Sequence, residues 1–129
     1  MRIREFDLEH VQKGDVLFLS ACSQCASTGT ISIEGPLDRS LVLRKTVKDR
    51  EPLTLDGDLR TAVVTGDGPI RLKAEIEVDC DLKVIKSGVL IADRDGKEQG
   101  IHFAFDIEDG SDNDFNDYWV NVACWHHRG

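Results

Sequence analysis

The sequence predicts an all-β fold, an antiparallel β-sandwich of about eight or nine short strands. Three observations favour this fold class. Apolar and polar residues alternate with a period of two in several segments, no stretch of about ten residues carries a helical stripe, and turn dipeptides punctuate the chain. With 129 residues, 40% of them hydrophobic, the chain is expected to form a single domain over residues 1–129 with a core of its own.

The strand candidates follow one another at roughly ten-residue spacing. In chain order they are Asp15–Ala21, Thr30–Glu34, Ser40–Val47, Pro52–Leu55, Leu59–Thr65, Lys73–Ile85, Gly88–Ala92, Gly100–Ile107 and Tyr118–Trp125. The dipeptides Asp56-Gly57, Asp67-Gly68 and Asp95-Gly96 lie between candidates and favour positive backbone φ, which predicts hairpin turns there.

Alternation is clearest in three of these segments. In Lys73–Ile85 the apolar residues at even positions, Cys80 among them, are predicted to face the core, in one strand or in two strands joined by a bend. In Gly100–Ile107 the apolar face leaves His102 exposed. In Tyr118–Trp125 the buried face is predicted to end with Cys124.

The net charge of −8 comes mostly from one segment. Six acidic residues and no basic one lie between Asp106 and Asp117, and without them the chain has 18 acidic and 16 basic residues. An acidic chain with no basic face argues against nucleic acid as the partner. No apolar run is long enough to cross a bilayer and no secretory leader is visible, so we expect no membrane partner and a cytoplasmic protein, or one exported without a classical signal.

The acidic segment has the composition of a calcium loop. Oxygen-bearing side chains recur at short intervals between two confident strands, at Glu108, Asp112, Asp114, Asn116 and Asp117. Oxygen ligands select a hard cation, and crowded carboxylates favour Ca²⁺ over Mg²⁺, which retains its waters. An EF-hand is excluded because Asp117 and Ala123 occupy the positions where that motif requires Gly and Glu. A solvated acidic turn without an ion is the alternative.

The acidic segment reads Glu108-Asp109-Gly110-Ser111-Asp112-Asn113-Asp114-Phe115-Asn116-Asp117. It resembles the calcium loop of the bacterial two-calcium fucose- and mannose-binding lectins, whose motif reads E-D-G-T-D-N-D-Y-N-D. The convincing match covers about a fifth of the chain. It continues into a final strand with a Trp near its end and a terminal Gly, but the family's W-P-L-G ending is replaced by Trp125-His126-His127-Arg128-Gly129.

The resemblance implies a set of site residues. Calcium would be held by Glu108, Asp112, Asp114, Asn116 and Asp117, and the carboxylate of Gly129 would enter the site of a neighbouring subunit, which implies a homodimer or a higher homo-oligomer. Asp109 matches an acid that binds the sugar. The family also uses an early Asn ligand, whereas this chain has none before Asn113, so Ser23 or Gln24 would supply an oxygen there. Ser23 is expected to contact the sugar together with Asp109. At least one calcium ion is expected, and a second is allowed.

The cysteines and histidines outside this segment leave several alternatives open. Reduced thiols are the default, a disulfide involving Cys22, Cys25 or Cys124 is an alternative, and zinc held by these cysteines with His126 or His127 is another. The two adjacent histidines are expected in solvent or at a subunit contact. The basic residues Arg44, Lys45, Lys48 and Arg50 are expected on a solvated strand face.

The sequence thus predicts a calcium-dependent lectin that binds a fucose-like or mannose-like monosaccharide or glycan, and no enzyme. Sugar hydroxyls would complete the calcium shell, and nearby carboxylates would accept their protons in charge-assisted hydrogen bonds. A calcium-stabilised structural or interaction module without sugar binding is the leading alternative. A hydrolase that uses Asp109 and Asp112 is a third class.

Overall fold

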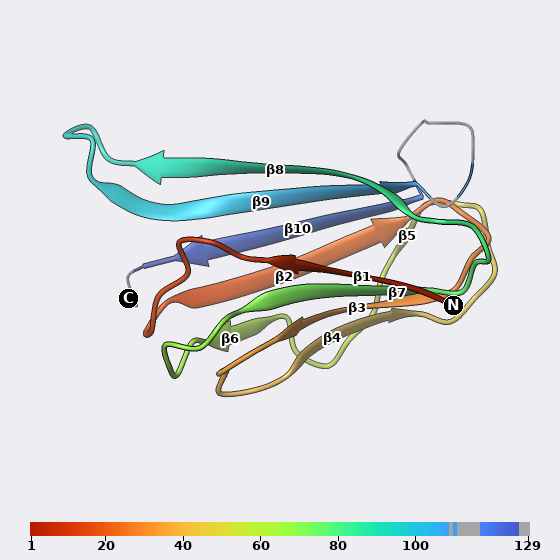
Figure 1. Cartoon of the computed structure of the whole chain (residues 1–129), viewed down its shortest axis with the longest axis horizontal. Coiled ribbons are helices and arrows are strands. Elements are labelled where there is room, and N and C mark those ends of the chain that lie inside the picture. Colours follow the sequence, from red (N-terminus) through yellow and green to blue (C-terminus); the bar gives the residue numbers. More distant parts are fainter. Residues whose placement is uncertain (109, 111–116, 127–129) are drawn as a thin grey trace.

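The computed structural model describes residues 1–108, 110 and 117–126, and all statements about the structure refer to these residues. They form ten strands in two sheets that pack face to face, so the predicted all-β sandwich is confirmed (Figure 1). No helix is found among them, and hence none of the length and hydropathy that a membrane span requires.

The smaller sheet has four antiparallel strands in the order β1-β7-β3-β4. Their bounds are β1 Arg2–Asp7, β3 Gly29–Glu34, β4 Leu41–Lys45 and β7 Arg71–Ile76. β1 was not predicted, because almost all of its side chains are exposed and it shows no buried face. It is held by pairing with β7 and by Phe6, whose ring lies 5.1 Å from that of Phe105 on the opposite sheet.

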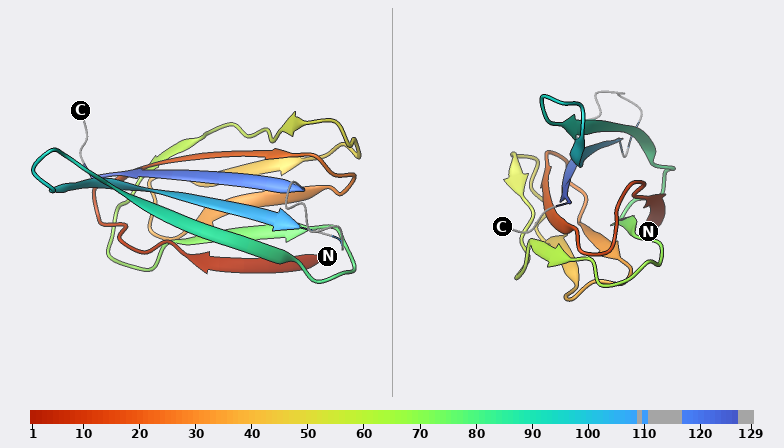
Figure 2. Two further views of the ribbon diagram at one scale, coloured as in Figure 1. Left: turned by 90° about the horizontal axis from the view of Figure 1, so that it is seen from above. Right: turned by 90° about the vertical axis from the view of Figure 1, so that its left-hand side faces the viewer.

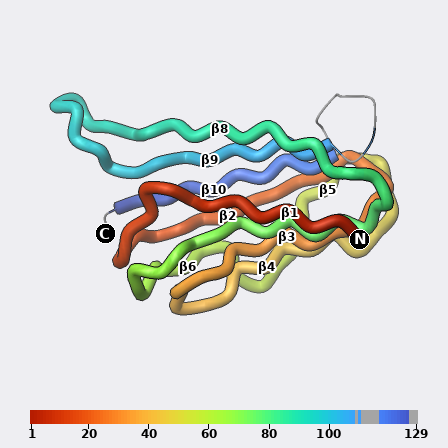
Figure 3. Tube along the Cα trace, viewed as in Figure 1, coloured from red at the N-terminus to blue at the C-terminus, as the bar shows by residue number. Residues whose placement is uncertain are grey.

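The larger sheet has the order β5-β2-β10-β9-β8, and the short strand β6 also pairs with β2. Its bounds are β2 Val16–Ser23, β5 Leu53–Thr54, β6 Thr61–Val63, β8 Lys83–Ala92, β9 Glu98–Glu108 and β10 Tyr118–Trp125. The prediction for β10 is confirmed to the residue. The β8–β9 hairpin is long and its turn projects beyond the other strands, as the trace in Figure 3 shows.

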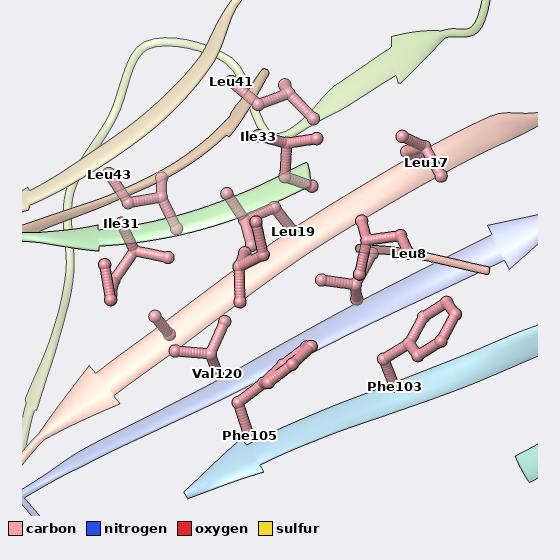
Figure 4. Close-up of a cluster of buried hydrophobic side chains, with 14 of the residues drawn as sticks. Leu8, Leu17, Leu19, Ile31, Ile33, Leu41, Leu43, Phe103, Phe105 and Val120 are labelled. Carbon is pink, nitrogen blue, oxygen red and sulfur yellow. The ribbon is translucent and has the colours of Figure 1, made fainter. Parts of the chain in front are cut away.

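The core lies between the two sheets and follows the predicted alternation (Figure 4). The inward residues of β2, β3, β4, β7, β9 and β10 are buried, among them Leu17, Leu19, Ile31, Ile33, Leu41, Leu43, Leu72, Ile76, Phe103, Phe105, Tyr118 and Val120. His102 is exposed and Cys124 is buried, as predicted.

The segment Lys73–Ile85 is two strand ends joined by a crossing, which is one of the two predicted forms. β7 ends at Ile76 in the smaller sheet, and β8 begins at Lys83 in the larger one. Leu82 is buried again, but Cys80 is exposed, so its assignment to the core was wrong. The period of two continued by chance through a segment that leaves one sheet for the other.

Only one of the three predicted hairpin turns has the predicted form. Gly96 has φ 81° and closes the β8–β9 hairpin, where the Asp93 side chain accepts hydrogen bonds from the backbone of Asp95 and Lys97. Gly57 and Gly68 do not have positive φ. Each lies in a connection between strands that do not pair with each other, so the hairpin prediction there was wrong.

Candidate functional site

Three adjacent strand ends meet at one end of the larger sheet. Tyr118, the first residue of β10, lies opposite Ser23 at the end of β2 and opposite Ile107 near the end of β9. The fold therefore brings Ser23, Glu108 and Asp117 to the same edge, although the first is 85 residues away from the second along the chain. Figures 1 and 2 show these strand ends on the same side of the sandwich as the start of β1.

The described residues of the acidic segment are its two boundaries and Gly110. Glu108 and Asp117 are 1% and 7% exposed, so both carboxylates are directed into the protein. Glu108 Oε1 accepts a hydrogen bond of 2.9 Å from the backbone N–H of Gly110, and the carbonyl of Asp117 accepts one of 3.2 Å from that of Gln24. The predicted site residues Asp109, Asp112, Asp114, Asn116 and Gly129 lie outside the described residues.

Ser23 is buried beside a lysine that the sequence did not single out. Lys45 Nζ donates to Ser23 Oγ at 3.2 Å, to the carbonyl of Asp49 at 3.0 Å and to the carbonyl of Cys25. Lys45 is only 4% exposed, so the expectation of a solvated basic face was wrong for this residue. Alternation along Leu41–Lys45 places its side chain on the buried face with Leu41 and Leu43, which is the signal that could have identified it.

Tyr118 stabilises the same edge of the sheet through its buried side chain. Its side chain is fully buried, and its hydroxyl donates to the carbonyl of Ser27 at 2.8 Å, which connects the start of β10 to the loop after β2. Gly29 allows this approach, since a Cβ there would lie 2.8 Å from the tyrosine oxygen. The base of the site is therefore fixed by packing as well as by strand pairing.

None of the four cysteines is joined to another in a disulfide. Cys22 faces Trp119 near the start of β10, whereas Cys124 lies near its end, so neither a disulfide nor a zinc site can join Cys22 and Cys25 to Cys124. Burial, together with the negative charge of Asp106, raises the pKa of the Cys22 thiol and keeps it protonated near neutral pH.

His126 is not a solvent-exposed tail residue. Its side chain is 10% exposed, its Nδ1 lies 2.9 Å from Asp15 Oδ2 and its Nε2 lies 2.6 Å from Glu98 Oε2. This cluster is at the end of β10 opposite to the one where Glu108 and Asp117 lie.

Comparison of the sequence with known families and with curated proteins finds no match. Two solved structures are similar in fold. The C-terminal domain of the BC2L-C lectin from Burkholderia cenocepacia has a TM-score of 0.65 and 19% identity, with 99% of this chain and 98% of that chain covered.

The second is the lectin CV2L from Chromobacterium violaceum, solved in complex with alpha-methyl-fucoside, with a TM-score of 0.62 and 17% identity over 97% of this chain and 96% of that chain. The chain thus has the fold of these two bacterial lectins over almost its entire length, which confirms at the level of the fold the resemblance noted for residues 108–117.

Proposed function

We propose that this protein is a calcium-dependent carbohydrate-binding protein whose calcium and sugar are held by the segment 108–117. The observation that carries the proposal is the convergence of Ser23, Glu108 and Asp117 at one edge of a lectin fold, at the boundaries of a segment that reads E-D-G-S-D-N-D-F-N-D. One of the lectins with this fold was solved with a methyl-fucoside, which supports a fucose-like ligand.

Electrostatics supports a divalent cation at this edge. Two buried carboxylates at adjacent strand ends, with further acids between them in the sequence, repel one another more strongly than they would in water. A calcium ion bound by these oxygens would reverse the sign of that interaction. Binding a sugar through calcium makes and breaks no covalent bond, so no catalytic role is proposed.

The position of Lys45 argues against Ser23 as a calcium ligand. Its Nζ is 3.2 Å from Ser23 Oγ, so an ion coordinated by that hydroxyl at about 2.4 Å would lie at most about 5.6 Å from the ammonium. At an effective dielectric constant of about 20, the repulsion between the ion and the ammonium would be at least about 6 kcal/mol. Ser23 is therefore a poor calcium ligand, and its predicted contact with the sugar stays a prediction.

A Gly129 carboxylate ligand would require a second copy of the chain. β10 has eight residues and spans about 26 Å, whereas the three residues that follow His126 can reach about 10 Å. If the carboxylate of Gly129 enters a calcium site, as the resemblance implies, that site would therefore belong to a neighbouring copy. We propose a homodimer or a higher homo-oligomer on this basis.

The calcium part of the proposal is tested by thermal unfolding with and without Ca²⁺. Ligand linkage predicts that calcium at a hundredfold excess over Kd stabilises the protein by about 2.7 kcal/mol. Asp114→Ala should remove this shift. Asp95→Ala is the matched control, because Asp95 is an exposed acid in the β8–β9 turn at the other end of the molecule, and should retain it. An equal shift in both variants would contradict the proposed site.

The sugar part is tested on a glycan array in the presence of calcium and again with EDTA. The expected result is binding to fucose-like or mannose-like glycans that EDTA abolishes. Binding that survives EDTA would contradict coordination of the sugar by calcium. A calcium-dependent thermal shift without any glycan bound would instead identify the structural module that shares the loop.

A further inference from the structure

A second cluster of metal-ligating side chains lies at the opposite end of the larger sheet. Asp15 immediately precedes β2, Cys124 is near the end of β10, and His126 follows that strand. Antiparallel pairing brings the three together, because Trp125 lies opposite Val16. The backbone N–H of His126 donates to the carbonyl of Gln99 at 2.9 Å, which holds the histidine beside β9.

Three potential ligand atoms converge within this cluster. Asp15 Oδ2 lies 3.2 Å from Cys124 Sγ and 2.9 Å from His126 Nδ1, and all three atoms lie within 4.8 Å of one another. Tetrahedral zinc, with bonds of about 2.0–2.3 Å, needs ligand atoms about 3.3–3.6 Å apart. To admit an ion, Asp15 Oδ2 would have to move away from each of the other two atoms by a few tenths of an ångström, while the third pair, Cys124 and His126, lies within 4.8 Å.

Burial distinguishes these groups from a chance surface cluster. Asp15 is 2% exposed and Cys124 is fully buried, so the carboxylate and the sulfur are fixed in place by the surrounding structure. The backbone N–H of Gln12 donates to the same Asp15 oxygen at 2.7 Å, which further restricts that side chain. The ligand atoms are thus arranged before any ion arrives, and this lowers the cost of binding one.

Glu98 supplies the outer partner that metal-bound histidines ordinarily have. His126 Nε2 lies 2.6 Å from Glu98 Oε2, so a carboxylate accepts a hydrogen bond from the N–H of the ring nitrogen that faces away from Asp15 and Cys124. Such a contact fixes the tautomer and makes the other nitrogen, here Nδ1, the metal ligand.

We propose that Asp15, Cys124 and His126 form a binding site for a zinc-class divalent ion, with Glu98 as a positioning residue. A set of one sulfur, one nitrogen and one oxygen suits Zn²⁺ and excludes the hard cations expected at the acidic segment. Binding replaces two protons, that of the Cys124 thiol and that of His126 Nδ1, by one ion of charge +2. If both protons are present before binding, the formal charge of the cluster is therefore the same before and after the ion binds.

A hydrogen-bonded cluster without metal is the competing explanation for the same distances, so the test must detect the metal–sulfur bond itself. The chain is first treated with EDTA, then titrated at neutral pH with Co²⁺ in a reductant that contains no thiol. Tetrahedral Co²⁺ bound to a thiolate gives a sulfur-to-cobalt charge-transfer band, which carboxylates alone cannot give. Zn²⁺ should displace the Co²⁺ and abolish the band.

The variants assign the band to a cysteine. Cys124→Ala should abolish it, and Cys80→Ala, which removes an exposed thiol outside the cluster, should retain it. The absence of a band in the unmodified protein, or a band that persists in a folded Cys124→Ala protein, would overturn the proposal. Folding of each variant is checked by urea unfolding, and His126→Gln provides a second ligand variant with the same expected loss of the band.

Glu98→Gln tests the positioning role. Removal of an outer partner of this kind lowers metal affinity by about 10–100-fold, so the Kd for Zn²⁺ should rise by that factor while the cobalt band of the saturated protein keeps its shape. An unchanged Kd would overturn the role of Glu98. These results do not depend on the proposed lectin function, since Ca²⁺ binding and its loss in Asp114→Ala are measured separately.

Discussion

His126 is the residue whose environment differs most from its expected place in a solvent-exposed tail. Asp15 before β2 and Glu98 on β9 contact its ring, and Cys124 near the end of β10 lies within 4.8 Å of it. His10 lies 4.0 Å from the other oxygen of Glu98. Burial alone would lower the pKa of the imidazole, but its hydrogen bonds to Glu98 and Asp15 outweigh burial and raise the pKa above 6.5.

This raised pKa predicts a pH-dependent stability in the metal-free protein. Because the folded state holds the proton more tightly than the unfolded state, the stabilisation is complete below the unfolded pKa near 6.5 and is lost as pH rises through the folded pKa. In EDTA, the loss of unfolding free energy in His126→Gln should be larger at about pH 5.5 than at about pH 8.5. Urea unfolding at both values measures it, and His102→Gln, on the exposed face of β9, is the control. An equal loss at both values contradicts a raised pKa.

Residue-scale prediction from the sequence succeeded where alternation alone decides burial and failed where partners are distant in the chain. The buried positions of Tyr118 and Cys124 follow from strand period. The contact between Cys124 and Asp15 joins residues 109 positions apart, which no local pattern reveals. Cys80 was misassigned because period two says nothing about where a strand ends.

At the scale of elements, the pairing of β9 with β10 depends on a glycine. Gly100 lies opposite Trp125, and a Cβ at Gly100 would lie 2.3 Å from the carbonyl oxygen of Cys124. Gly88, on the neighbouring strand β8, has only side-chain atoms at 3.5 Å and beyond around its Cβ position. The same substitution should therefore have different effects at the two positions.

Gly100→Ala should lower the unfolding free energy by about 1–3 kcal/mol, because backbone must move to admit the methyl group. Gly88→Ala should be neutral or slightly stabilising, since glycine weakens a strand interior and the added methyl has room. Urea unfolding of each variant, compared with that of the unmodified protein, measures the two changes in unfolding free energy. A loss at Gly88 equal to that at Gly100 would contradict the close approach of β10 to the Gly100 position of β9.

Elements with a buried face were predictable and those without one were not. β3, β9 and β10 were found within two residues of their ends because each alternates between core and solvent. β1 was missed, and β8 was divided between the two candidates Lys73–Ile85 and Gly88–Ala92, because their exposed side chains carry no period. Both are edge strands, which are held by pairing on one side and by few core contacts.

At the scale of the whole molecule, the sandwich separates two chemically different clusters. The fold class and the location of the acidic segment between two strands were predictable, because each depends on local pattern. The convergence of Asp15, Cys124 and His126 was not, since it depends on which strands pair and in which register. β10 connects the two ends, with Asp117 just before it and His126 just after it.

This separation predicts that the two clusters contribute independently to stability. Nine residues of extended chain place Asp117 about 30 Å from His126, well beyond the distance of about 10 Å at which mutational effects usually couple. In EDTA, the losses of unfolding free energy in Asp117→Asn and His126→Gln should add in the double variant to within about 0.5 kcal/mol.

The matched comparison is Asp15→Asn combined with His126→Gln. The two side chains are in direct contact, so the losses of unfolding free energy in these variants should not add. All four states of each cycle are measured by urea unfolding at one protein concentration, so that any self-association is held constant. A coupling energy above about 1 kcal/mol in the distant pair would mean that strand β10 transmits strain from one end of the sandwich to the other, and that the two clusters cannot be treated as separate sites.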